Sequence, residues 1–287
     1  MDLLQVIVSG LLLGGVYALL AAGLNLIFGV MRVINLAHGE LLMLGAYATF
    51  FFYDTTGLNP LLAIPLVAAA MFAGGMVLQR LTIERVVGQP LLSSLLLTFG
   101  LSTLLTGVAL NLWTTNFRSV VYEPLTGSLG IGGLSISRSR LVAFAIALVV
   151  SGATYVFLRR STWGKAIRAT AQHAEVAQVC GIDVGRVRLV SFGLGSAMAA
   201  TAGSLVAIVF TFNPEIGRVF IGKAFAIIVL GGLGSFVGAF LGALTLGVTE
   251  TLAAYYTSTQ LSEAVAYAVM VGVLLVRPSG FFGQAES

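Results

Sequence analysis

The stretch of this chain that looks most like a reaction motif is Gly217 to Ala224, which reads GRVFIGKA. It follows most of the phosphate-binding pattern G-x-x-x-x-G-K-[ST], but Ala224 stands where a hydroxyl must bind Mg²⁺. It also lies at the expected outer end of an apolar segment, with no strand before it. We therefore interpret Lys223 as a helix-end residue whose side chain reaches the membrane interface, and not as a nucleotide ligand.

Residues suited to nucleophilic or metal-assisted catalysis are scarce. His38 and His173 are the only histidines, Cys180 is the only cysteine, and the sequence contains no G-x-S-x-G elbow. His38 and Glu40 together supply two metal ligands, whereas a catalytic zinc site takes three from the protein. The sequence therefore predicts no catalytic residue, no bound metal and no enzymatic activity.

A polar cluster formed by Asn35, His38, Gly39 and Glu40 interrupts the apolar sequence in the first half of the chain. One interpretation is structural: Asn35 caps the next helix, and the helix dipole stabilises Glu40 in its first turn. The other is functional. Because ionisable groups near the bilayer core are costly, the cluster would form a hydrogen-bonded or proton-sensitive joint between two membrane helices.

Two further carboxylates, Glu250 and Glu263, border a stretch rich in tyrosine and threonine. Both are expected near the ends of apolar segments, where amphipathic side chains such as Tyr gather at the membrane–water interface. We interpret them as part of an interfacial belt and predict no proton relay.

The elements that must position these residues are predicted to be membrane helices. The chain is 58% hydrophobic and 9% charged, with a mean hydropathy of +1.01, whereas soluble domains have about 25% charged residues. Its long segments without charge can each hold the roughly 20 apolar residues of a transmembrane helix. The expected spans are residues 3–28, 37–53, 58–79, 90–112, 141–158, 187–211, 222–235, 236–256 and 260–276. Because some of these are short, the sequence predicts an all-α polytopic bundle of eight or nine membrane segments, forming one domain over residues 1–287.

The basic residues predict how the bundle is oriented. Residues 159–188 carry many Lys and Arg side chains but only Glu175 and Asp183 as acidic ones, and basic loops remain on the cytoplasmic side of a membrane. The net charge of +4 is therefore attributed to loops that orient the helices in the lipid bilayer, and no nucleic-acid binding is expected.

Three arginines lie on the side expected to be external, although most basic residues are expected on the cytoplasmic side. They are Arg118, Arg138 and Arg140. Between them, residues 128–137 alternate small and apolar side chains around a Gly-Gly pair at 132–133. Such a pair tolerates the backbone of a tight turn, which predicts a short external β-hairpin.

Small residues recur every four positions from Ser191 to Ala207 and from Gly231 to Gly247, and each strip is expected along one helix face. Membrane helices associate through such small residues because lipid provides no hydrophobic drive between helices. We expect the strips to be packing surfaces, with a pore lining as the alternative. The glycines assigned to packing are Gly195, Gly203, Gly231, Gly234, Gly238 and Gly242.

The order of features near residues 10–50 is repeated near residues 193–240: a Gly-rich span, a polar break and a short helix. An odd number of predicted spans separates the two regions, so they would have opposite orientations. Inverted repeats of this kind are a common plan for transporters.

Three stretches of the sequence are distinctive. They are NLAHGELLMLGAY at 35–47, GKAIRATAQHAEVAQVCGIDVGR at 164–186 and KAFAIIVLGGLGSFVGAFLG at 223–242. Together they resemble the permeases of branched-chain amino acid ABC transporters, the LivH-like family. The expected hairpin and the Arg-Pro-Ser-Gly sequence at 277–280 extend the resemblance over almost the whole chain.

The resemblance implies a multi-pass permease of the bacterial inner membrane that moves branched-chain amino acids, or related small amino acids and amides. It implies as partners a second homologous permease subunit, two cytoplasmic ABC ATPase subunits and a periplasmic substrate-binding protein. No cofactor is expected on this chain, since ATP with Mg²⁺ would be used by the ATPase subunits.

By the same resemblance, residues 159–188 are a cytoplasmic coupling loop in which residues 164–181 dock on the ATPase. The residues assigned to coupling are Gly164, Arg168, Ala171, Ala174, Glu175 and Gly181. Residues 171–175 read AQHAE, which departs from the E-A-A sequence of other ABC importers. An alternative is a basic helix that rests on anionic lipid headgroups.

Two other classes of function fit the sequence less well. An ion-coupled secondary transporter of a small polar solute would place paired carboxylates or broken-helix ion sites at the middle of the membrane, and Glu250 is expected too close to a helix end for this. An intramembrane enzyme would need more His, Cys or buried Asp than the sequence contains.

Overall fold

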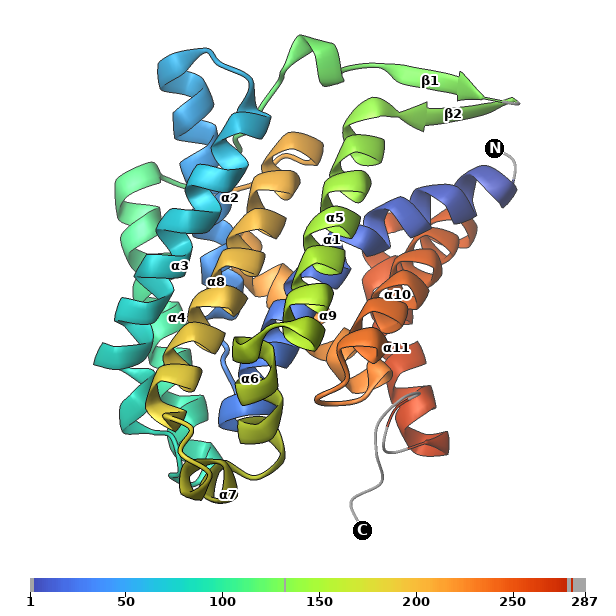
Figure 1. Ribbon diagram of the computed structural model, residues 1–287. Helices are drawn as coiled ribbons and strands as arrows, with labels where there is room; N and C mark the ends of the chain where they lie inside the picture. The colour runs from blue at the N-terminus through green and yellow to red at the C-terminus, as the bar shows by residue number, and fades with distance from the viewer. Residues whose placement is uncertain (1–2, 132, 278–279, 281–287) are drawn as a thin grey trace.

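The computed structural model describes residues 3–131, 133–277 and 280, most of which are helical (Figure 1). In chain order the elements are α1 (Leu3–Met31), α2 (His38–Thr56), η1 (Pro60–Leu62), α3 (Ala63–Leu81), η2 (Ile83–Arg85), α4 (Leu91–Trp113), η3 (Glu123–Leu125), β1 (Ser128–Ile131), β2 (Leu134–Ser137), α5 (Arg138–Arg160), α6 (Thr162–Gln172), α7 (Ala174–Val179), α8 (Val184–Val209), α9 (Ile216–Gly231), α10 (Phe236–Tyr256) and α11 (Thr259–Val276). Below, the two ends of the bundle are called the hairpin end, near β1 and β2, and the α7 end.

Six helical segments within the described residues are long and apolar enough to cross a membrane. They are α1, the segment Pro60–Arg85 that contains α3, and α4, α5, α8 and α10. The shorter α11 is also apolar, whereas α2 and α9 are outside this set. The chain is therefore an all-α, multi-pass membrane protein, and the total of eight or nine segments stays a prediction.

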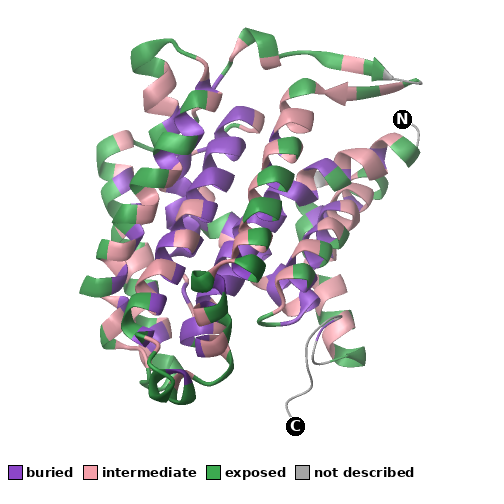
Figure 2. Cartoon of the chain, viewed as in Figure 1, coloured by how far each residue is buried: buried purple, intermediate pink, exposed green. Residues whose placement is uncertain are grey.

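The N-terminal helix α1 lies at the centre of the bundle, where it contacts α5, α8, α9 and α10. Every residue from Val16 to Ile27 is buried, and α1 and α8 have more buried residues than any other helix among the described elements (Figure 2). Gly14 brings α1 and α10 together, because a Cβ atom there would lie 2.8 Å from the Ala243 carbonyl oxygen. Such backbone proximity supplies the van der Waals contact that holds membrane helices together.

The first small-residue strip faces the interior of the bundle. Its five members, Ser191, Gly195, Ala199, Gly203 and Ala207, are all buried, and α8 contacts α1, α2 and α3. A Cβ atom at Gly195 would lie 2.8 Å from the Gly23 carbonyl oxygen of α1, and one at Gly203 would lie 2.8 Å from the Leu42 carbonyl carbon of α2. Glycine at positions 195 and 203 therefore allows α8 to pack closely against both α1 and α2.

The second strip does not lie on one helix, and the expected span 222–235 was placed too late. α9 runs from Ile216 to Gly231, and α10 begins at Phe236. Gly232 between them has φ +94°, a backbone conformation that ends a helix and that only glycine adopts readily. The helix therefore breaks at the Gly-rich turn and not after it.

Across this turn, Gly231 and Gly238 pack backbone to backbone, and a Cβ atom at Gly231 would lie 2.6 Å from the nitrogen of Ala239. A Cβ atom at Gly242 would lie 2.9 Å from the Ile227 carbonyl oxygen. Gly234 was also predicted to be a helix-packing glycine, and this is wrong. A Cβ atom at Gly234 would have nothing within 4 Å in the described part of the chain. It is a turn residue at which the bundle leaves open space.

The predicted hairpin is confirmed. β1 and β2 pair antiparallel, from Ser128 opposite Ser137 to Ile131 opposite Leu134, and residue 132 of the expected Gly-Gly turn lies outside the described residues. The side-chain nitrogen of Gln5 on α1 donates to the Ser135 carbonyl oxygen of β2 at 3.0 Å. The hairpin is thus attached to the start of the central helix.

The two regions expected to be repeats form similar pairs, a long helix followed by a shorter one. These are α1 with α2 and α8 with α9, and across the pairs α1 contacts α8 and α2 contacts α9. This arrangement accommodates an inverted repeat, which stays a prediction.

Candidate functional site

The helix α6 is fixed firmly to the end of α5. The hydroxyl of Ser161 accepts a hydrogen bond from the backbone nitrogen of Gly164 at 2.8 Å and caps the helix. Gly164 is buried, and a Cβ atom there would lie 2.6 Å from the Cα of Leu158. The guanidinium of Arg168 donates to the Leu158 carbonyl oxygen. The two helices therefore form one rigid corner.

One face of α6 is turned toward the bundle. Ile167 and Thr170 are buried, and the partly buried Ala171 packs against the main hydrophobic core. Ala171 therefore supports α6 from within, and a larger side chain there would disturb internal packing as well as any surface that α6 presents.

The next helix, α7, presents apolar side chains to solvent. Val176 is 59% exposed and Val179 is 89% exposed. The helix ends in a Schellman turn: the backbone nitrogen of Ile182 donates to the Ala177 carbonyl oxygen, and that of Gly181 to the Gln178 carbonyl oxygen, both at 3.0 Å. Gly181, with φ +83°, supplies the left-handed residue that this motif requires.

A hollow lies beside α7, between the start of α8 and η2. Ala174, Glu175 and Gly181 line it together with Glu84 and Arg188, and the last two form an ion pair with an N–O distance of 3.3 Å. Carboxylates outnumber basic groups in its lining, since Asp183 also contributes. The exposed valines and this hollow both belong to the α7 end of the bundle.

The structure thus divides the predicted coupling residues into two groups. Gly164, Arg168 and Ala171 build the base of α6, whereas Ala174, Glu175 and Gly181 line the hollow.

The Asn35–Glu40 joint lies inside the bundle. Asn35, His38 and Glu40 are each at most 1% exposed. The ring nitrogen Nε2 of His38 lies 3.2 Å from the Leu20 carbonyl oxygen of α1, and the Ser102 hydroxyl of α4 donates to Glu40 at 2.9 Å. The joint therefore connects α1, α2 and α4 by hydrogen bonds, and its response to protons stays a prediction.

The expected capping role of Asn35 is wrong. α2 begins at His38 after Ala37, and the Asn35 side-chain amide has no hydrogen-bond partner among the described residues. Gly39 instead fixes the start of α2 against α9, because a Cβ atom there would lie 2.9 Å from the Gly217 carbonyl carbon. Glu40 does lie in the first turn of the helix, as expected.

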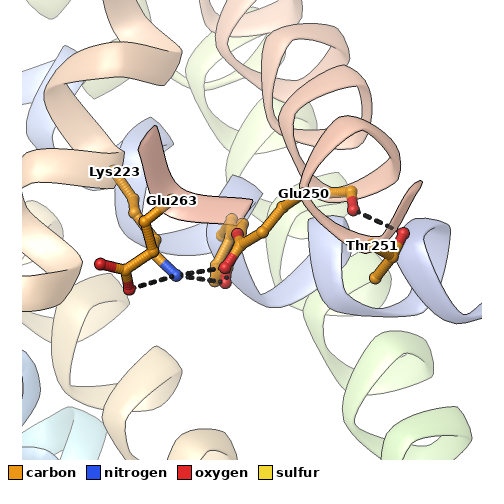
Figure 3. A network of polar contacts seen from close by, with 6 residues as sticks. Lys223, Glu250, Thr251 and Glu263 are labelled. Atoms are coloured by element: carbon orange, nitrogen blue, oxygen red, sulfur yellow. Dashed lines mark hydrogen bonds and ion pairs between the residues drawn. The ribbon is translucent and has the colours of Figure 1, made fainter. Parts of the chain in front are cut away.

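A third polar site, which the sequence did not reveal, surrounds Lys223 (Figure 3). Its ammonium lies 2.6 Å from a Glu250 carboxylate oxygen and 3.5 Å from one of Glu263. The same ammonium donates to the Tyr17 hydroxyl at 3.0 Å, and that hydroxyl donates to Glu250 at 2.9 Å. The site therefore joins α1, α9, α10 and α11.

This network corrects the interpretation of Lys223 as a helix-end residue and of Glu250 as part of an interfacial belt. Lys223 lies in the middle of α9 and is 7% exposed. The partners of its ammonium come from three other helices, so no local spacing in the sequence signals the pairing. The signal available was the presence of ionisable residues within an apolar region, which marks a functional candidate by default.

Neither a metal site nor a phosphate-binding loop is formed by the residues that the structure describes. No three His, Cys, Asp or Glu side chains of the described ranges come together where they could hold a metal ion. Gly217–Ala224 lies in the first half of α9, where Gly217 packs against Glu40.

Comparison with known proteins identifies the family to which this chain belongs. Residues 6–274 match the family described as the permease component of branched-chain amino acid transport systems. The chain is 34% identical to the high-affinity branched-chain amino acid transport system permease protein LivH of Salmonella typhimurium, over 99% of this chain and 96% of that protein. It is also 34% identical to the corresponding protein BraD of Pseudomonas aeruginosa, with the same coverage. Among solved structures it resembles a chain of PsaBC from Streptococcus pneumoniae in complex with Fab, with a TM-score of 0.48 and 14% identity over 97% of this chain and 93% of that one. The chain therefore belongs to the permease family of branched-chain amino acid transport systems, which is a family of transport proteins and not of enzymes.

Proposed function

We propose that this chain is the transmembrane permease subunit of an ABC importer that carries branched-chain amino acids, or related small amino acids and amides, across the bacterial inner membrane. The named substrates of LivH and BraD support the substrate class. The observation that carries the energy-coupling role is the surface of α7, with its exposed valines, acidic hollow and rigid connection to α5.

In this proposal the α7 end faces the cytoplasm and the hairpin end faces outward. The basic residues of 159–188 lie at the α7 end, in agreement with the bias of cytoplasmic loops. α2, α9 and α11 are membrane segments in addition to the six longer ones, which gives nine membrane segments in one permease domain.

The proposed assembly contains a second homologous permease, two cytoplasmic ABC ATPases and a periplasmic substrate-binding protein. ATP with Mg²⁺ is bound by the ATPases, and this chain binds no cofactor. Its own contribution is mechanical: the substrate passes through without bond chemistry, as the helices change from outward-open to inward-open.

The connections of α7 support this mechanical role. A displacement of α7 would be transmitted to α5 through the rigid corner at Gly164, and to α8 through the Schellman turn at Gly181. α8 is packed by backbone contact against α1, α2 and α3. Movement of the ATPase surface would therefore displace the central helices and not only a surface loop.

The test compares variants of the reconstituted importer for ATP hydrolysis stimulated by loaded binding protein and for leucine uptake. Val179→Asp places a charge on the exposed valine, and Gly181→Val strains the turn by about 1–2 kcal/mol. Each should lower stimulated hydrolysis and uptake about tenfold, which corresponds to about 1.4 kcal/mol of docking energy. Full activity of both would contradict the coupling assignment.

The control is the Arg159→Gln/Arg160→Gln double variant, which removes two basic residues next to α6 and leaves the surface of α7 unchanged. It should retain coupled hydrolysis, because docking depends on shape at α7. If this variant fails while the α7 variants work, the segment rests on lipid headgroups instead.

One observation favours a second candidate, a secondary transporter driven by an ion gradient. Such a protein needs paired carboxylates within the membrane, and Glu250 and Glu263 share Lys223 there. Uptake by this chain alone under a proton or sodium gradient would establish that candidate, and uptake that requires the ATPases and ATP would reject it.

A further inference from the structure

One face of α11 docks on two consecutive residues of α9. Glu263 and Tyr267 are one helical turn apart on α11, with Ala266 between them, and this row faces Gly222 and Lys223. Ala266 is 4% exposed. The hydroxyl oxygen of Tyr267 would lie 2.5 Å from a Cβ atom at Gly222, so glycine permits this close contact.

The two carboxylates hold Lys223 unequally. Glu250 lies 2.6 Å from the ammonium and its side chain is 13% exposed, whereas Glu263 lies 3.5 Å away and its side chain is 47% exposed. Tyr17 bridges the ammonium and Glu250. Partly exposed ion pairs at such distances contribute little, while a buried hydrogen-bonded one is costly to break. Glu263 is therefore the exchangeable partner, and Glu250 the permanent one.

The site also carries more negative charge than its pairing requires. Lys223 and Glu250 cancel, which leaves the carboxylate of Glu263 as the excess negative charge of the site. Because the buried ion pair is complete without it, Glu263 needs a reason other than the stability of that pair.

The rest of α11 is held by apolar packing, in which Met270 and Val273 contact the main hydrophobic core. It packs against α9 and α10, and among the α11 residues whose burial is described only Ser262 and Ala266 are buried. Near its other end, Leu275 and Val276 are more than 80% exposed. Beside this packing, Glu263 provides the ion pair that joins α11 to α9 among the described residues.

We propose that Lys223 and Glu263 form a weak ion-pair latch that favours contact of α11 with α9 in the resting permease and opens during each transport cycle. This proposal rests on the proposed function as an ATP-driven permease. When the latch opens, Glu263 leaves Lys223, which stays bound to Glu250 and Tyr17, and α11 moves away from α9 at the hairpin end. Glu263 is thus a positioning residue for transport, and the substrate does not need to touch it.

The test measures the distance between spin labels on α11 and on the α8–α9 connection in the reconstituted importer. Labels are placed at Gln260 and Thr211, both exposed and at the hairpin end, in a Cys180→Ser background. The resting protein should give one main distance. ATP with loaded binding protein, or trapping with vanadate, should add a second, longer one.

Glu263→Gln should populate the longer distance without ATP and raise the ratio of open to closed forms about fivefold, as expected for loss of a partly exposed ion pair. Glu263→Asp should restore part of the closed form. Glu215→Gln is the matched control: it removes an exposed carboxylate near the start of α9 and should leave both distances unchanged.

If the wild-type importer transports its substrate while the distance stays the same with and without ATP, the latch does not exist. The same conclusion follows if Glu263→Gln and Glu215→Gln give the same distances. If the complete wild-type assembly shows no ATP-driven uptake, the proposed function fails, and the latch fails with it.

Discussion

The contact between α2 and α8 at Gly203 allows a quantitative prediction. A methyl group added by Gly203→Ala would lie 2.8 Å from the carbonyl carbon of Leu42 and 2.9 Å from the nitrogen of Ala46, whereas ordinary contacts begin at 3.4 Å. The carbonyl oxygen of Leu42 would lie closer still, so the helices must separate by more than 0.6 Å, the difference between 3.4 and 2.8 Å. Both neighbours are helix backbone, which cannot rotate out of the way.

The energetic cost follows from this separation. Overpacking of an interior costs about 1–3 kcal/mol. The hydrogen bond from Thr49 to Ser204, now 2.7 Å long, joins the same two helices, and its loss adds about 0.6 kcal/mol in a membrane. Alanine stabilises a helix by about 1 kcal/mol relative to glycine, which offsets part of this cost. The expected net loss of stability is about 0.6–2.6 kcal/mol.

The assay is thermal unfolding of the purified protein in detergent. Gly107→Ala on α4 is the matched control, because nothing in the described residues lies within 4 Å of the added atom. Gly203→Ala should lower the Tm by several degrees, while Gly107→Ala should leave it unchanged or raise it. The larger changes Gly203→Leu and Gly238→Leu should reduce the yield of assembled protein. Equal Tm values for the two alanine variants would refute the packing argument.

Three further outcomes are expected. Cys180, which is exposed, should react with a membrane-impermeant thiol reagent in inverted vesicles but not in intact cells, and labelling from outside would overturn the orientation. Gly39→Ala should lower the Tm, because the added methyl group would lie 2.9 Å from the Gly217 carbonyl carbon, and an unchanged Tm would show that α2 and α9 can separate freely. Arg118→Ala should also lower the Tm, since the guanidinium lies 5.1 Å from the ring centre of Phe50 and cation–π contacts contribute about 0.5–2 kcal/mol. Arg118→Lys should retain part of that contribution, and equal Tm values for the two arginine variants would argue against it.

Features with a local cause could be predicted from the sequence. The long apolar segments became helices because a bilayer requires every backbone group to be satisfied within the helix. The strip of small residues from Ser191 to Ala207 became a packing face because its spacing matches the helical period. The hairpin followed from the alternating pattern beside its turn.

Features that depend on distant partners could not be predicted. Lys223 was interpreted as a helix-end residue, yet it lies in the middle of α9, where Glu250 of α10 neutralises it. Arg118 lies on the side where the charge bias predicts few basic residues, and its guanidinium lies over the aromatic rings of α2. In both cases the compensating group is far away in the chain, and a single sequence does not show which groups will meet.

The central place of α1 has a consequence for the order of assembly during synthesis. α1 is translated first, but its most extensive contacts are with α10, near the other end of the chain. At Gly10 and Gly14 its backbone meets residues of α10 directly. A nascent chain therefore carries a helix whose small-residue groove remains filled by lipid or by a chaperone until translation is nearly complete. Chains that terminate before α10 therefore lack the partner that α1 contacts at Gly10 and Gly14.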